Sequence, residues 1–250
     1  MARLDGGMSS FAIAGKGGFA FTGARFDKLG ATDYTLVSIA IDVTGSVDGF
    51  SDLLRQMLVT SVGACKKNPR SENILVRVIL FSDRFPNGVE ELHGFKPLAD
   101  IDVNAYPKLV TGGMTPLNDS CYSVSGSTNI YAKGLRGNDF GVNGIEFIIT
   151  DGGENASVTT MRMVKDEFAK LISEEVLESN ISILIGVNAS QYKQLLEEFQ
   201  REAGITHYKD AGDATERNLA KLAAFVSQSV SSQSQAVGSG GPSQHISATI

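Results

Sequence analysis

The sequence predicts an α/β fold in which a mostly parallel, Rossmann-like central sheet is covered by helices on both faces. From Tyr34 onward, short β-branched and apolar runs alternate with longer segments of helical periodicity. The apolar runs are almost continuous, which is typical of strands buried on both faces. Polar residues and glycines follow several of these runs directly. Together these observations indicate strands, helices and a cluster of loops at one edge of the sheet.

Four apolar runs are expected to form the central strands. They span residues 35–41, 74–81, 145–150 and 181–187. Runs of this length that are rich in Ile, Leu and Val suit buried parallel strands. A shorter and more polar run at residues 88–94 is interpreted as part of a short edge strand or a hairpin.

Three segments between or after these runs are predicted to be helices. Apolar residues recur at helical spacing within residues 50–65, 161–176 and 213–229, so each segment can bury one face against the sheet. The last segment opens with Asp213 and Glu216 at the spacing of a capping box. Pro116 is expected in the first turn of a further helix.

The sequence divides into three parts. Residues 1–33 form an N-terminal extension, in which residues 10–23 are interpreted as two short strands around a Gly-rich turn. The GKGG segment within it lacks the spacing of a phosphate-binding loop. Residues 34–228 form the folded domain. Residues 229–250 are rich in Ser, Gln and Gly, and we expect a flexible tail because they offer little apolar area to bury.

Composition excludes several classes of protein. The chain has 250 residues and a formal net charge of -6, which argues against a nucleic-acid-binding surface. No apolar run is long enough to cross a membrane. Cys65 and Cys121 have no zinc-site spacing and are expected to be buried thiols. The first residues do not read as a signal peptide, so a cytoplasmic location is expected.

Three polar clusters are expected to meet at the carboxyl end of the sheet. The sequences are DVTGS at residues 42–46, TGGMTP at residues 111–116 and TDGGEN at residues 150–155. The first and third follow apolar runs directly, and ligands of open parallel sheets bind outside the carboxyl ends of strands. Carboxylate and hydroxyl oxygens are the ligands that Mg²⁺ prefers. The candidate metal residues are Asp42, Thr44, Ser46, Thr115 and Asp151.

This arrangement resembles the von Willebrand factor A (vWA) family, whose metal-ion-dependent adhesion site (MIDAS) combines DxSxS, a later Thr and an Asp after a central strand. The resemblance covers about residues 34–227 and implies a Rossmann-like vWA fold. It also implies that Thr44, Ser46 and Thr115 ligate the metal, while Asp42 and Asp151 act largely through waters and hydrogen bonds. The implied cation is Mg²⁺, with Mn²⁺ or Ca²⁺ as alternatives. Thr44 departs from the commoner Ser, which keeps the hydroxyl and adds a methyl group.

The function expected from these features is a protein-binding module, an adaptor or scaffold and not an enzyme. Neutral metal ligands leave the cation able to accept an anionic oxygen, so the expected partner is a protein presenting Asp or Glu. Self-assembly is a further option. The alternative is a metal-dependent phosphoester hydrolase, in which Glu154 would be the general base, although a solvated loop carboxylate is the plainer interpretation. His93, His207 and His245 suggest no nucleophile triad.

Overall fold

A twisted sheet runs through the centre of the protein. The computed structural model describes residues 6–13 and 18–237. The strands of these residues are β1 (Met8–Ala12), β2 (Ala20–Ala24), β3 (Asp33–Asp42), β4 (Ile74–Phe81), β5 (Val89–Pro97), β6 (Gly141–Thr150), β7 (Asn180–Gly186) and β8 (His207–Asp210). Their order across the sheet is β1-β2-β5-β4-β3-β6-β7-β8.

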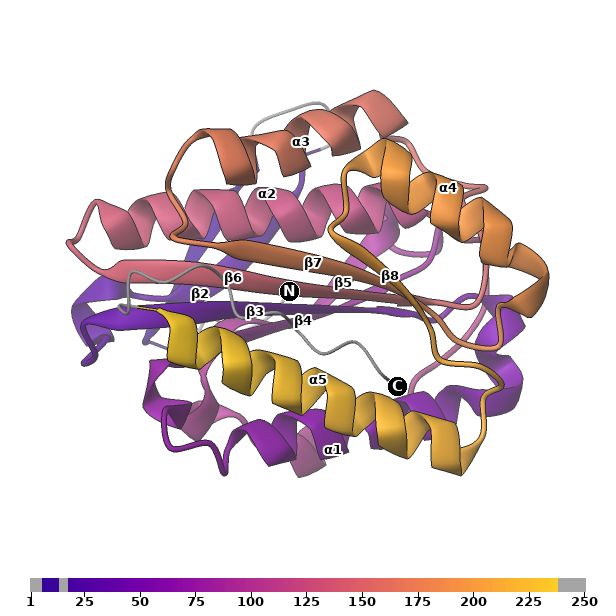
Figure 1. Cartoon of the computed structure of the whole chain (residues 1–250), viewed down its shortest axis with the longest axis horizontal. Helices are drawn as coiled ribbons and strands as arrows, with labels where there is room; N and C mark the ends of the chain where they lie inside the picture. The colour runs from indigo at the N-terminus through magenta and orange to yellow at the C-terminus, as the bar shows by residue number, and fades with distance from the viewer. Residues whose placement is uncertain (1–5, 14–17, 238–250) are drawn as a thin grey trace.

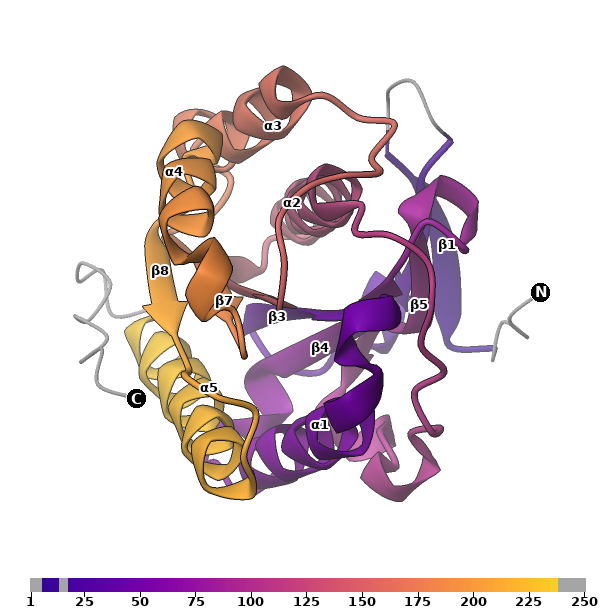
Figure 2. The same cartoon turned by 90° about the vertical axis from the view of Figure 1, so that its right-hand side faces the viewer.

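Helices cover both faces of the sheet and make a three-layer structure (Figures 1 and 2). The α-helices of the described residues are α1 (Ser51–Cys65), α2 (Leu117–Arg136), α3 (Met161–Ser173), α4 (Lys193–Ala203) and α5 (Glu216–Ala236). Helices α1 and α5 lie on one face, and α2, α3 and α4 lie on the other. Each face buries its own apolar cluster, so the sheet is sandwiched between two cores. Within the described ranges, no helix is both long and apolar enough to span a membrane.

The four central strands predicted from the sequence are confirmed as β4, β3, β6 and β7. These strands pair in parallel, and β8 extends the parallel set at the far edge. The chain passes from β3 to β4 on one side, and later returns to β6 on the other side of β3. The order of strands therefore reverses at β3, which places the carboxyl ends of β3 and β6 at the point where open sheets bind ligands.

The run expected to be an edge strand lies instead inside the sheet. It is the nine-residue β5, antiparallel to β4, and β2 pairs with its other side. Strands β1 and β2 form an antiparallel pair, so β1 is the edge. Close approach of β2 requires Gly94, since a Cβ there would lie 1.9 Å from the carbonyl oxygen of Thr22. Residues 15–17 of the turn expected at GKGG lie outside the described residues.

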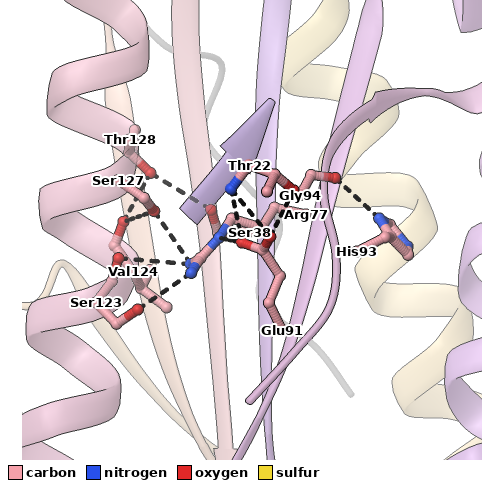
Figure 3. Close-up of polar contacts among 10 residues, drawn as sticks. All are labelled: Thr22, Ser38, Arg77, Glu91, His93, Gly94, Ser123, Val124, Ser127 and Thr128. Carbon is pink, nitrogen blue, oxygen red and sulfur yellow. Dashed lines mark hydrogen bonds and ion pairs between the residues drawn. The ribbon is translucent and has the colours of Figure 1, made fainter. Parts of the chain in front are cut away.

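A buried ion pair links this N-terminal pair of strands to the rest of the domain (Figure 3). Arg77 of β4 is 1% exposed, and its Nε donates to Glu91 of β5 at 2.8 Å. Its terminal nitrogens donate to the hydroxyls of Ser123 and Ser127 on α2, both at 3.1 Å. The Glu91 carboxylate also accepts from the backbone nitrogen and the hydroxyl of Thr22. The Glu91 carboxylate therefore links β2 and β5 to the buried guanidinium of Arg77 on β4.

The helix at the C-terminal end of the described residues extends further than the sequence suggested. The expected tail from residue 229 is wrong for its first eight residues, because α5 continues to Ala236. Val230 and Ser234 are fully buried there. Gln233 donates to the carbonyl of Gly144 at 3.1 Å. The cap is also different, because Thr215 accepts from the backbone of Asn218 and replaces the capping box expected at Asp213. Residues 238–250 lie outside the described residues.

Both cysteines are buried free thiols, as predicted. Burial raises the pKa of Cys65 to about 12 and raises the pKa of Cys121 further. Thiolates are the reactive form of cysteine, so both side chains are poor nucleophiles and serve the packing.

Candidate metal centre

Three loops meet at the carboxyl end of the sheet, as the sequence predicted. The loop after β3 and the loop before α2 are joined by two backbone hydrogen bonds, from Gly45 to the carbonyl of Gly113 (3.1 Å) and from Gly112 to the carbonyl of Val43 (3.0 Å). The loop after β6 joins them through Asn155, whose backbone nitrogen donates to the carbonyl of Thr115 at 3.1 Å. These bonds fix the three candidate clusters relative to one another.

Asp42 forms the base of this arrangement. It ends β3, is 1% exposed, and accepts from the backbone nitrogen of Thr44 at 2.9 Å and from the hydroxyl of Thr150 at 2.7 Å. Burial is the main cause that raises the pKa of Asp42 to about 6, and the nearby charge of Asp151 adds to it. The two hydrogen bonds oppose that rise. Asp42 is therefore a buried carboxyl group whose charged form is supported by hydrogen bonds.

The hydroxyls of the first loop bridge Asp42 to the second carboxylate. The Thr44 and Ser46 hydroxyl oxygens lie 3.1 Å apart, and the Ser46 hydroxyl donates to Asp151 at 2.8 Å. Asp151 follows β6 directly, and partial burial raises its pKa. The fold therefore brings together two strand-end carboxylates separated by 109 positions, through a pair of hydroxyls.

Thr115 reaches the same place from the loop before α2. Its backbone nitrogen donates to the side-chain oxygen of Asn155 at 2.7 Å. Gly113 has a φ of +78°, and a Cβ there would lie 2.2 Å from the Asp83 carboxylate, so this loop needs glycine for its conformation and for close packing. Asp83 in turn accepts from the backbone of Met114 at 2.8 Å. The loop before α2 is thus held by hydrogen bonds to Asn155 on one side and to Asp83 on the other.

The candidate residues line one open cavity of about 520 Å³. Thr44, Ser46, Thr115 and Asp151 contribute to its wall, and the buried Asp42 lies behind them. Three neutral hydroxyls and one carboxylate give an all-oxygen donor set that fits a hard divalent cation. The rest of the wall contains Gly113, Met114, Gly152, Gly153, Glu154, Asn155, Asn188, Gln191, Tyr192 and Leu195.

Two residues that sequence reasoning did not assign to the site support it. Thr150 donates to Asp42, and Asn155 positions Thr115. The signal for Thr150 was its place directly before Asp151, where a strand that ends in two polar residues presents them on opposite faces. Asn155 had no such signal, because its partner lies forty residues away on another loop.

Glu154 differs from the solvated carboxylate expected in this loop. It accepts from the backbone nitrogens of Asn118 (2.7 Å), Ala156 (2.9 Å) and Ser157 (2.7 Å), and from the Ser157 hydroxyl at 2.6 Å. A carboxylate with four donors braces the loop after β6 against the start of α2. His93 packs against Tyr106, with its Nε2 2.8 Å from the phenol oxygen.

Neither family models nor the sequences of curated proteins match this chain. Solved structures do share its fold. The pilus adhesin SpaC from Lactobacillus rhamnosus GG, in its open conformation, matches 90% of this chain at 10% identity with a TM-score of 0.61. A variant of the PilB minor pilin from Streptococcus sanguinis matches 86% at 15% identity and a TM-score of 0.57.

A third similar structure contains a bound metal. Proximal thread matrix protein 1 from the mussel byssus, solved with a zinc-occupied MIDAS motif, matches 81% of this chain at 16% identity with a TM-score of 0.50. The matches span 32%, 65% and 47% of SpaC, PilB and the byssus protein, so this chain covers only part of each. The fold is the Rossmann-like α/β fold of the vWA type.

Proposed function

We propose that this chain is a vWA domain that binds a divalent cation at a MIDAS and uses it to hold a carboxylate of a partner protein. The observation that carries the proposal is the cavity shared by Thr44, Ser46, Thr115 and Asp151, with Asp42 behind it. Mg²⁺ is the first candidate, and Mn²⁺ or Ca²⁺ are the alternatives. The adhesin, pilin and byssus matrix structures with this fold support a binding role over an enzymatic one.

The donor set explains why a partner carboxylate would be favoured. Hydroxyls bring no charge, so a cation that they hold keeps most of its positive charge for a further ligand. Asp151 would orient the Ser46 hydroxyl, Asp42 would hold the loop through the Thr44 backbone, and both would hydrogen-bond metal-bound waters. A partner Asp or Glu would then complete the coordination, whereas an Asn or Gln amide oxygen would attract the cation far less.

Metal binding is tested first, on the full chain. Calorimetric titration with Mg²⁺, Mn²⁺ and Ca²⁺ should show binding that Asp42→Ala weakens at least about tenfold, or 1.4 kcal/mol. The control is Asp52→Ala, an exposed carboxylate in the first turn of α1. Equal affinities in the wild type and in Asp42→Ala would remove the site assignment, while the fold assignment would stand.

Partner capture is tested second. Binding of the partner protein to the domain should disappear in EDTA and return with Mg²⁺. Thr115→Ala should weaken this binding while the protein stays folded. Thr111→Ala is the matched control, because Thr111 lies on the same loop but its hydroxyl donates to Asp48 and does not line the cavity. A partner whose binding is indifferent to EDTA and to Thr115→Ala binds through another face.

A further inference from the structure

Exposed apolar side chains gather around the candidate metal centre. Among the described residues, every large hydrophobic side chain that is exposed lies in the loops or helix starts at the carboxyl end of the sheet: Val110 (68%), Met114 (54%), Val158 (70%), Tyr192 (39%) and Leu195 (49%). Three of them, Met114, Tyr192 and Leu195, line the cavity of the candidate site and are called the apolar rim below. Apolar groups that gather on one face mark binding surfaces.

The apolar rim is held in place by the fold. The Met114 backbone donates to the Asp83 carboxylate at 2.8 Å, which leaves the thioether side chain outside. Leu195 packs on the loop after β6, since a Cβ at Gly153 would lie 2.3 Å from its methyl carbon. The Tyr192 backbone donates to Ala189 at 2.8 Å. A surface with a fixed backbone loses little entropy when a partner binds.

One ligand can reach both the rim and the site. A Cβ built at Gly152 would lie 3.9 Å from the Thr115 hydroxyl oxygen and 4.0 Å from the Tyr192 ring. A single point on the cavity wall therefore touches both groups. The Thr115 hydroxyl oxygen and the Tyr192 ring carbon therefore lie less than 8 Å apart, a span that two side chains close together in one segment can bridge.

The charges in the cavity wall limit which groups the ligand can carry. Its wall includes the carboxylates of Asp151 and Glu154, and no Lys, Arg or His among the described residues lines it. A second acidic group on the ligand would thus face negative charge. Apart from the hydroxyls, the remaining side chains of the wall are the amides of Asn155, Asn188 and Gln191 and the apolar rim, and these suit neutral and apolar groups.

We infer that the apolar rim selects a polypeptide segment in which one Asp or Glu is flanked by a bulky apolar residue. The inference rests on the proposed function, because the carboxylate is held by the cation, while the rim binds the neighbouring side chain. The rim supplies the preference among acidic segments, and the metal supplies the requirement for an acid. These two contributions can be measured separately.

The test uses three blocked peptides titrated into the full chain with Mg²⁺ and followed by NMR. They carry Leu-Asp-Leu, Ser-Asp-Ser and Leu-Asn-Leu between glycines. Leu-Asp-Leu should bind at least about tenfold more tightly than Ser-Asp-Ser, because only leucine buries apolar area on the rim. Equal binding of these two peptides overturns the rim inference. Failure to distinguish Asp from Asn, or no Mg²⁺-dependent binding of any peptide, overturns the proposed function and the inference with it.

Matched variants assign the preference to the rim. Tyr192→Gln and Leu195→Gln should each reduce the preference for Leu-Asp-Leu several-fold, while the protein stays folded and still binds Mg²⁺. Val158→Gln is the control, because Val158 is equally apolar and more exposed but lies outside the cavity. A preference that survives both rim variants, or that Val158→Gln removes as strongly, places the selecting surface elsewhere and overturns the inference.

Discussion

The last two turns of α5 should be needed for stability, although their composition resembles a linker. The perturbation is a pair of truncations, one ending at Gln228 and the other ending at Val237. Both lack residues 238–250, so the comparison isolates residues 229–237. The sequence there is SVSSQSQAV, and Val230 is fully buried while Val237 is 3% exposed.

The magnitude follows from the contacts that are lost. Burial of one Val is worth on the order of 1.5–3 kcal/mol. The amide of Asn143, itself fully buried, donates to the backbone carbonyl of Gln233 at 2.6 Å, and its loss costs about 1–2 kcal/mol. With two buried Val residues and this hydrogen bond lost, we expect the shorter chain to lose roughly 4–8 kcal/mol of a total unfolding free energy of about 5–15 kcal/mol.

Urea denaturation of both truncations measures this difference, and thermal melting should show a drop of roughly 10 °C or more. Gln233→Ala provides a point variant that removes the bonds from its side chain to Gly144 and Ser179 but keeps the helix. Equal denaturation midpoints for the two truncations would refute the reasoning and return residues 229–237 to the role of a tail.

Two further predictions concern buried charges and are tested by urea denaturation. Glu91→Gln should lower the free energy of unfolding by about 3–5 kcal/mol, because it leaves the Arg77 guanidinium, 1% exposed, without its carboxylate. Arg77→Met should lower it less, since Glu91 is 18% exposed and keeps its bonds to Thr22. Equal losses would contradict this asymmetry. Burial raises the pKa of Glu146 from 4.5 to about 7, so the folded chain binds more protons and stability should fall by on the order of 3 kcal/mol as pH rises through that window. Glu146→Gln should flatten this dependence, and an unchanged slope would exclude Glu146 as its source.

The sequence was informative where burial produced a simple pattern. Strands β3, β4, β6 and β7 are buried on both faces and appear as apolar runs. All the candidate site residues except Thr115 lie at or just after the ends of β3 and β6. Loop contacts such as that between Thr115 and Asn155 carry no periodic signal, because they join segments far apart in the chain.

Helix α2 shows why other elements were harder to predict. It is buried along most of its length between the sheet and α3. Many of its buried residues are Ser, Thr and Asn, which in an amphipathic helix would be expected on the exposed face. Ser125 and Thr128 satisfy their hydroxyls on carbonyls of the preceding turn. Small polar residues that bond to their own helix can be buried without an apolar stripe, so no periodicity marks the helix.

The end of α5 was misread for a related reason. Val226, Val230 and Val237 recur at helical spacing, but the positions between them are mostly Ser and Gln. Gln233 is buried through hydrogen bonds to β6 and to Ser179 and not through apolar contacts. A prediction from composition considers apolar area alone, so it treated this segment as a flexible tail.

The hydrogen bonds of the candidate site join residues that are far apart in the chain. Asp42 and Thr150 are 108 positions apart, and Ser46 and Asp151 are 105 apart. Closing loops of that length is entropically expensive until the intervening β4, α2 and β6 have assembled. A chain still emerging from the ribosome lacks the second carboxylate until residue 151 is free to fold. On the proposed function, gain of cation binding should therefore coincide with the pairing of β6 with β3, and it would report that step in kinetic folding experiments.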